Sequence, residues 1–254
     1  MRYFIRFSYC GTAYHGSQTQ PNGITVQQTM EQAFATILRQ PVGLTFAGRT
    51  DAGVHAEMMY AHFDMSDAIT DIPAFMGRLN NLLPQDISVQ AIMPVRDDAH
   101  TRFDAIARTY EYRITEQKNA FLPCQIARVP AGLDYQKMNE AAKALLGKQD
   151  FASFCRVHTD VKTTICNVQQ AEWTTIPSAT APIGIFTICA DRFLRNMVRA
   201  VVGTLFEVGK GRMTVPQFCD IIAQHNRCAA GQSAPAEGLF LTNITYPTEL
   251  FIHE

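Results

Sequence analysis

The sequence lacks the features that would assign it to several common protein classes. None of its seven cysteines is spaced as CxxC, so neither a zinc ribbon nor a disulfide framework is expected, and a reducing compartment fits best. No apolar run approaches the ~20 residues of a membrane span. Arg2 and Arg6 interrupt the apolar residues at the start of the chain, whereas a signal peptide has an uninterrupted apolar region. We therefore expect a cytoplasmic protein that does not bind a membrane and holds no metal.

The chain also lacks an excess of charge of either sign. Its 22 Lys and Arg residues are balanced by 23 Asp and Glu residues, for a formal net charge of -1. This balance argues against a protein that coats nucleic acid through bulk charge. It does not exclude a locally basic cleft, because binding depends on the local electrostatic field and not on the net charge.

What the sequence does contain is a repeated order of strand and helix patterns. Thr25 and Gln28 form a capping-box pattern at the start of an amphipathic helix over 25–40. The other patterns predict strands at 2–9, 42–47, 54–65, 87–95, 107–116, 163–174, 183–190 and 239–246, and helices near 72–82, from Asp134 to Leu146, at 193–208 and from Thr214.

Strand pairs with interspersed helices favour an α+β fold with a mostly antiparallel sheet. The segment 93–104 is the expected crossover between two halves, residues 1–98 and 99–254. No low-complexity linker separates these halves, so we expect one continuous sheet.

The segment GRTDAGVHA, residues 48–56, brings Arg49 and Asp51 onto a glycine-bracketed bend. One interpretation is a turn in which the carboxylate caps backbone N–H groups. The other is that the bend presents Asp51 to a substrate. Arg49 is two residues away, so in an extended segment it points to the other face and contacts substrate rather than pairing with Asp51.

A second cluster of basic residues lies within 191–212. If the predicted helix includes Arg192, Arg195 and Arg199, these side chains form one stripe beside a heavily apolar face. Such a stripe is either a solvated basic face or a set of phosphate contacts, and one arginine could also pair with a buried carboxylate.

Aromatic and basic residues alternate in RFDAIARTYEYRI, residues 102–114. Tyr110 and Tyr112 share one face of the expected strand. Either ring could stack on an unpaired base, whereas a core position is the default for one of the pair.

Six ordered blocks of the chain resemble the tRNA pseudouridine synthase A (TruA) family. The match is carried by AGRTDAGVHA (47–56), YCGTAYHGSQTQ (9–20), TRFDAIARTYEY (101–112), DFASFC (150–155), FLRNMVRAVVG (193–203) and APAEGLFLTNITY (234–246).

This resemblance implies a homodimeric enzyme that isomerises uridine to pseudouridine at positions 38–40 in the anticodon stem-loop of tRNA, without metal or organic cofactor. It implies a sheet built from two ferredoxin-like halves, with the active site in the cleft between them. Carried over by position, the implied catalytic residues are Asp51, Tyr110 and Arg199, with Arg199 pairing with Asp51. Arg49 would fill the space left by the flipped base, and Leu239 would pack in the pocket.

The chain departs from the family pattern at a few positions. Cys10 stands where the family usually has Asp, Ser17 where an aromatic residue is common, and Ala99 and Thr101 replace residues of the usual F-H-A-R-F pattern. Two other classes stay open. A glycoside hydrolase needs a second facing carboxylate, for which Glu57 is the only obvious candidate. A catalytically inactive RNA-binding module would have lost the aspartate or the arginine.

Overall fold

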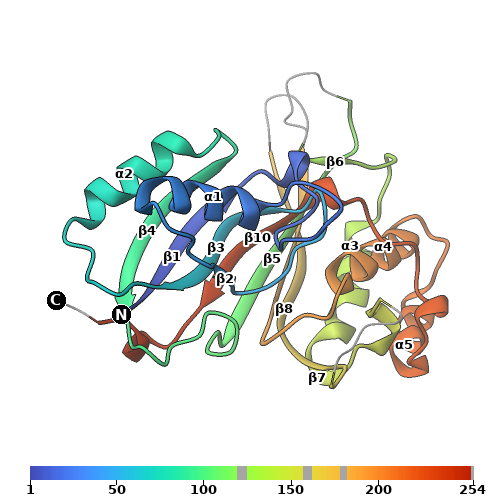
Figure 1. Cartoon of the computed structure of the whole chain (residues 1–254). Coiled ribbons are helices and arrows are strands. Elements are labelled where there is room, and N and C mark those ends of the chain that lie inside the picture. The colour runs from blue at the N-terminus through green and yellow to red at the C-terminus, as the bar shows by residue number, and fades with distance from the viewer. Residues whose placement is uncertain (119–124, 157–161, 178–181, 253–254) are drawn as a thin grey trace. The chain divides into compact units, whose positions relative to one another are not determined.

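The computed structural model describes residues 1–118, 125–156, 162–177 and 182–252 (Figure 1). The chain divides into two compact units, the first comprising Met1–Ile106 with Leu241–Glu254 and the second Ala107–Phe240. Helices and mostly antiparallel strands alternate in both, so the α+β fold class is confirmed. The boundary expected between residues 98 and 99, and the continuous sheet, remain predictions.

The first unit is built on β1 (Arg2–Tyr9), β3 (His55–Asp64) and β4 (Ile87–Val95). These strands are antiparallel in the order β4-β1-β3, and the short β2 (Thr45–Phe46) pairs with β3. Helix α1 (Val26–Leu38) connects β1 to β2, and α2 (Ile72–Leu82) connects β3 to β4. The order β-α-β-β-α-β is that of a ferredoxin-like unit.

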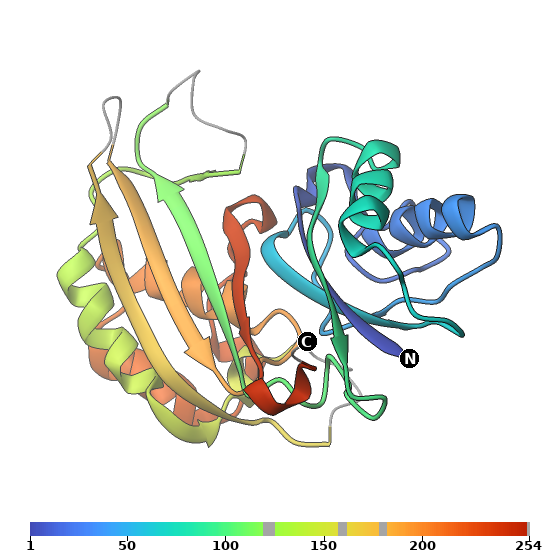
Figure 2. The same ribbon diagram turned by 90° about the vertical axis from the view of Figure 1, so that its left-hand side faces the viewer.

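Both helices of this unit cover the same face of its strands (Figure 2). The ring of Phe34 in α1 lies 4.9 Å from Phe63 of β3 and 5.6 Å from Phe75 of α2 between centroids. The side chains of Thr25 and Asp71 accept hydrogen bonds from backbone N–H groups at the two helix starts. Local capping and one aromatic cluster together fix the helices against the sheet.

The second unit contains β5 (Ala107–Thr115), β9 (Ile183–Ala190), β8 (Ile165–Ile176) and β7 (Gly147–Asp150), antiparallel in that order. The two-residue β6 (Ala127–Arg128) runs parallel to β5. The described part of this unit also contains the helices α3 (Tyr135–Ala142), α4 (Met197–Gly209) and α5 (Val215–Gln224). Strand β10 (Leu239–Thr245) begins here, and its residues from Leu241 belong to the first unit.

An aromatic cluster joins the strands of the second unit to its helices. The ring of Trp173 on β8 lies 5.2 Å from Phe186 of β9 and 5.9 Å from Phe206 of α4. Tyr135 at the start of α3 meets the same indole edge-on at 5.9 Å. These contacts bury the inner face of β8 and β9, and they hold α4 close to β5 through Tyr112, whose ring is 6.1 Å from Phe206.

Two expected helices differ from the structure. The helix predicted at 193–208 begins only at Met197, because Asn196 adopts a left-handed conformation with φ of 65°. The helix from Asp134 ends at Ala142 and continues as a 3-10 turn to Leu145, after which Gly147 at φ 93° begins β7. The short strands β6 and β7 carry too few residues for a period-2 pattern to predict them.

Candidate functional site

Asp51 opens a tight turn in the first unit. The backbone N–H of Val54 donates a 3.2 Å hydrogen bond to the carbonyl oxygen of Asp51, with Gly53 at φ 79° in the third position. A positive φ there is what a type II turn requires, and it favours glycine. Asp51 is half-buried and Arg49 exposed. The bend is therefore a true turn that leaves part of the carboxylate accessible.

The residue before Asp51 is anchored from two sides. The backbone N–H of Thr50 donates a 2.8 Å hydrogen bond to Oγ of Ser17, and the N–H of Ser17 donates to the carbonyl oxygen of Thr50 at 3.2 Å. The hydroxyls of Thr50 and Tyr9 are 2.8 Å apart, and all three residues are buried. These bonds fix the backbone directly adjacent to the catalytic candidate.

The residues after Asp51 are held by the loop that follows β1. The N–H of Gly11 donates a 3.0 Å hydrogen bond to Nδ1 of His55, whose side chain is 1% exposed. A Cβ at Gly11 would lie 2.0 Å from the carbonyl oxygen of Val54, and one at Gly16 would lie 2.8 Å from that of Thr50. Glycine is thus required at both positions for the close approach to the turn.

Sequence reasoning missed the structural role of this loop. In the sequence Ser17 stands out only as a departure from the family pattern, yet its Oγ accepts a hydrogen bond from the neighbour of Asp51. No local signal separates it from an exposed loop serine, because its partner lies 33 residues away. Cys10 makes a different contact: its Sγ is 3.3 Å from the hydroxyl of Thr12, and its N–H donates to the carbonyl oxygen of Asp86.

The other predicted site residues lie in the second unit. Tyr110 is half-buried on β5, and its ring meets Phe193 edge-on at 5.1 Å. Tyr112 on the same face is fully buried, and its hydroxyl donates a 2.8 Å hydrogen bond to the carbonyl oxygen of Pro235. Burial raises the pKa of Tyr112 above its ordinary range. Tyr112 is therefore the core member of the pair.

Arg199 is oriented by the segment that precedes β10. Its Nε donates a 2.7 Å hydrogen bond to the carbonyl oxygen of Ala234, and the N–H of Ala234 donates to the carbonyl oxygen of Arg199 at 2.9 Å. The side chain is half-buried on α4. A guanidinium whose Nε is fixed presents its remaining N–H groups in a defined plane.

The stripe of three arginines on one helix is a wrong prediction. Arg192 and Arg195 precede α4, and only Arg199 lies within it. The carbonyl oxygen of Arg195 accepts a hydrogen bond from the N–H of Arg156, while the N–H of Arg192 donates to Oδ1 of Asp191. The bond to Arg156 uses a carbonyl oxygen that the expected helix would need. Arg195 is exposed and Arg192 half-buried, so both can still reach a ligand.

Leu239 is the first residue of β10 and is 6% exposed. The next residue, Phe240, has the guanidinium of Arg113 over its ring at 4.1 Å from the centroid. Arg113 also donates to Glu111 at 2.7 Å. The cation–π contact and the ion pair tie the start of β10 to β5 within the second unit.

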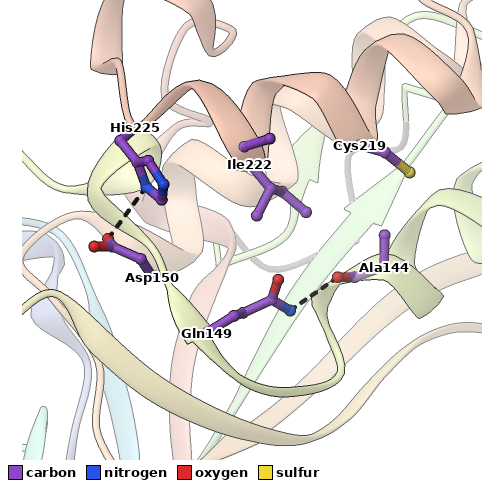
Figure 3. A pocket seen from close by; sticks show the side chains of 7 residues that line it. Ala144, Gln149, Asp150, Cys219, Ile222 and His225 are labelled. Atoms are coloured by element: carbon purple, nitrogen blue, oxygen red, sulfur yellow. Dashed lines mark hydrogen bonds and ion pairs between the residues drawn. The ribbon is translucent and has the colours of Figure 1, made fainter.

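Two pockets are lined by none of the predicted site residues. One, of about 320 Å³, is lined by residues of α5 and β7, with His225 Nδ1 lying 3.7 Å from Oδ1 of Asp150 (Figure 3). The other, of about 390 Å³, is lined by residues of 40–45 and 62–66. Within the described ranges, no group of three or more His, Cys, Asp or Glu side chains could hold a metal ion. In the same part of the chain, no helix has the length and hydropathy to cross a membrane.

Comparison with known proteins identifies the family. The family model described as tRNA pseudouridine synthase matches residues 141–247. The chain is 54% identical to the tRNA pseudouridine synthase A of Bacteroides fragilis, over 98% of each chain. It is 52% identical to that of Parabacteroides distasonis over 98% of each chain, and 53% identical to that of Bacteroides thetaiotaomicron over 100% of this chain and 93% of the relative. The chain therefore belongs to the tRNA pseudouridine synthase A family.

Proposed function

We propose that this protein isomerises uridine to pseudouridine at positions 38–40 in the anticodon stem-loop of tRNA. Family membership makes it an isomerase acting on tRNA uridine. The observation that carries the assignment of Asp51 is the anchoring of its turn: Ser17 bonds the residue before it, and Gly11 bonds His55 behind it. A catalytic carboxylate must be held on rigid backbone, whereas a solvated turn has no need of buried anchors.

The reaction breaks the bond between C1′ of the ribose and N1 of uracil, and it forms a bond between C1′ and C5. The proton on C5 leaves to water, and a proton is returned to N1. The uridine must first leave the base stack, which costs a few kcal/mol and least in a loop. Arg49, exposed two residues before Asp51, is proposed to occupy the space that the base leaves.

Asp51 is proposed as the group that acts on the ribose. A carboxylate can attack C1′ and form a covalent intermediate, or it can take the C2′ proton and produce a glycal. Both routes require the ionised form. Arg199 is proposed to pair with Asp51 and to favour that form, since an opposite charge nearby stabilises a carboxylate. The bond of its Nε to the carbonyl oxygen of Ala234 supports this role, because it fixes the plane of the guanidinium.

Tyr110 is proposed to stack on the uracil and to move the C5 proton. Its half-buried ring leaves room for a base, in contrast to the fully buried Tyr112. Leu239 is proposed to form an apolar wall of the pocket, and Arg192 and Arg195 to contact phosphates. The protein is proposed to work in the cytoplasm as a homodimer without cofactor. Sedimentation should then give twice the chain's 28.3 kDa, and a monomer mass would contradict the dimer.

The test is a tritium-release assay with purified protein and tRNA labelled at C5 of uridine. We expect label in water, no release by Asp51→Ala, and tRNA affinity of that variant within a few-fold of the parent. Appreciable pseudouridine from Asp51→Ala would contradict the role of the carboxylate. Labelled free uracil in place of labelled water would indicate a glycoside hydrolase, and binding without release would indicate an inactive RNA-binding module.

A further inference from the structure

Two arginines of strand β1 in the first unit belong to the sheet face opposite the helices. Along β1, Tyr3 and Phe7 belong to the face that α1 and α2 cover, as the stacking of Tyr3 on Phe63 at 5.5 Å shows. Side chains alternate along a strand, so Arg2, Phe4 and Arg6 belong to the other face. Arg6 is half-buried there, between Tyr60 of β3 and Ala91 of β4 in the strand register.

The end of the chain covers only part of this second face. The ring of Phe4 lies 5.3 Å from Tyr246 and 6.0 Å from Phe251 between centroids. Tyr246 also meets Tyr60 edge-on at 5.1 Å. Arg6 is the next residue of this face along β1, and it stays partly exposed.

The two arginines of this face differ in their partners. Arg2 donates from Nε and from a terminal nitrogen to the two carboxylate oxygens of Asp64, both at 2.8 Å, and from its other terminal nitrogen to the carbonyl oxygen of Ala99. In Arg6, Nε is buried and has no hydrogen-bond partner in the part of the chain that the structure describes. Arg6 also makes no ion pair with any described residue.

Such a group carries a positive charge that is partly stripped of water and not compensated. Buried N–H groups in folded proteins are nearly always paired, and each exception calls for an explanation. A buried charge without a partner costs free energy, which is why removing one member of a buried ion pair is strongly destabilising. An arginine at this position therefore points to a ligand that supplies the missing negative charge.

We infer that Arg6 binds a backbone phosphate of the substrate RNA on the open part of this sheet face. This inference rests on the proposed function. The guanidinium fork matches the oxygens of a phosphate, and its delocalised charge lets an anion at the terminal nitrogens compensate the burial of Nε. Tyr60 lies directly opposite on β3 and is 7% exposed, so it forms the apolar side of the position at which Arg6 lies.

The test compares Arg6→Met with Arg78→Met in the otherwise unchanged protein. Arg78 lies exposed on α2, on the helical side of the same unit, with its guanidinium 5.8 Å from the ring centroid of Phe75. We expect Arg6→Met to weaken tRNA binding about 3- to 10-fold and to reduce the slope of log affinity against log salt by roughly 0.7 to 0.9, one phosphate contact. Arg6→Lys keeps the charge and should keep the slope.

A second readout is the stability of the free protein. Because Arg6→Met removes an uncompensated charge, we expect its Tm without RNA to be higher than that of the parent, whereas binding is weaker. Parental affinity and slope in Arg6→Met, or an equal loss in Arg78→Met, would overturn the inference. Tritium release by the unaltered protein is measured in parallel. If the protein releases no tritium but the salt slope of tRNA binding still depends on Arg6, the proposed isomerase activity is rejected and the phosphate site is kept. If tritium release is normal and the slope does not depend on Arg6, only the phosphate site is rejected.

Discussion

The backbone N–H of Thr50 donates a 2.8 Å hydrogen bond to Oγ of Ser17, across 33 residues of sequence. Both residues are buried, with Ser17 completely so. The bond fixes the position directly before Asp51, and the reciprocal backbone bond from Ser17 to Thr50 makes the connection two-sided. The geometry of the turn therefore depends on a residue that belongs to a different loop.

Ser17→Ala should lower turnover more than it lowers tRNA affinity. The variant leaves the N–H of Thr50 buried without its acceptor, which costs about 1–3 kcal/mol, and it frees the residue next to Asp51 to move. A small misplacement of a catalytic group reduces the rate steeply. The measurement is kcat from single-turnover tritium release, together with the tRNA Kd and the free energy of unfolding.

Ser153→Ala is the matched control. Ser153 is equally buried, but its Oγ donates to the carbonyl oxygen of Ile221 and accepts from the N–H of Asn226 in the second unit. It should show a comparable loss of stability with kcat unchanged. Equal effects of the two variants on kcat would mean that Ser17 acts only through global stability.

Tyr110→Phe and Tyr112→Phe should separate catalysis from packing. Tyr110→Phe keeps the ring for stacking but removes the hydroxyl, so we expect tRNA affinity within a few-fold and a turnover lower by about 10²-fold or more, the range of general acid–base catalysis. Tyr112→Phe loses the bond to the carbonyl oxygen of Pro235. That variant should be less stable by about 1 kcal/mol and otherwise active. A loss of turnover in Tyr112→Phe together with a loss of stability only in Tyr110→Phe would show that Tyr112 is the catalytic tyrosine and Tyr110 the core residue.

The elements that the sequence predicted well carry their own start and stop signals. Asp71 followed by Pro73 gives α2 a cap and a favoured first turn, and α2 begins and ends where it was expected. α4 shows the opposite case. Its apolar pattern continues upstream to Phe193, but the left-handed conformation of Asn196 prevents the helix from beginning before Met197. The carbonyl oxygen of Arg195 instead accepts a hydrogen bond from the N–H of Arg156 in a distant segment. Long-range backbone bonds leave no local trace in a sequence.

The candidate site divides in the same way. Asp51 and Gly53 could be found because a turn with a positive φ leaves a glycine in the sequence. The strand pattern could not distinguish Tyr110 from Tyr112, which share one face; only the family resemblance pointed to Tyr110, and the packing of Phe206 and Pro235 against Tyr112 decides which ring is buried. Ser17 and Arg6 were overlooked as contacts because a residue's burial depends on its spatial neighbours. The catalytic roles themselves remain predictions.

The stability of the first unit should fall in mild acid because of His62. Burial lowers the pKa of this imidazole to about 4 from its ordinary value, with a smaller effect of the nearby Arg2. The folded pKa lies below the unfolded one, near 6.5, so the stabilisation is complete above pH 6.5 and is lost as the pH falls toward 4. Between pH 7.5 and pH 5 the free energy of unfolding should drop by about 2 kcal/mol from this group.

Denaturant unfolding of the parent and of His62→Gln at several pH values checks this. The variant should lose part of the dependence of the unfolding free energy on pH between pH 6.5 and 4. The remainder comes from His100, because burial lowers the pKa of that imidazole as well. An NMR titration of the parent gives an independent value, with a midpoint near 4 expected for His62. A midpoint near 6.5 would show that the ring is hydrated, and the acid sensitivity would then need another source.

Arg192 and Arg195 should each contribute to the salt dependence of tRNA binding, but not equally. Neither lies on a helix, so they share no stripe: Arg195 is exposed, and Arg192 is half-buried beside Asp191. Arg195→Ala should reduce the slope of log affinity against log salt by roughly 0.7 to 0.9, and Arg192→Ala by less, because Arg192 is half-buried whereas Arg195 is exposed. Lys148→Ala, an exposed cation on β7, is the control that should leave the slope unchanged. Unchanged slopes in both arginine variants would remove this segment from the phosphate contacts and leave Arg6 in the first unit as the contact to test.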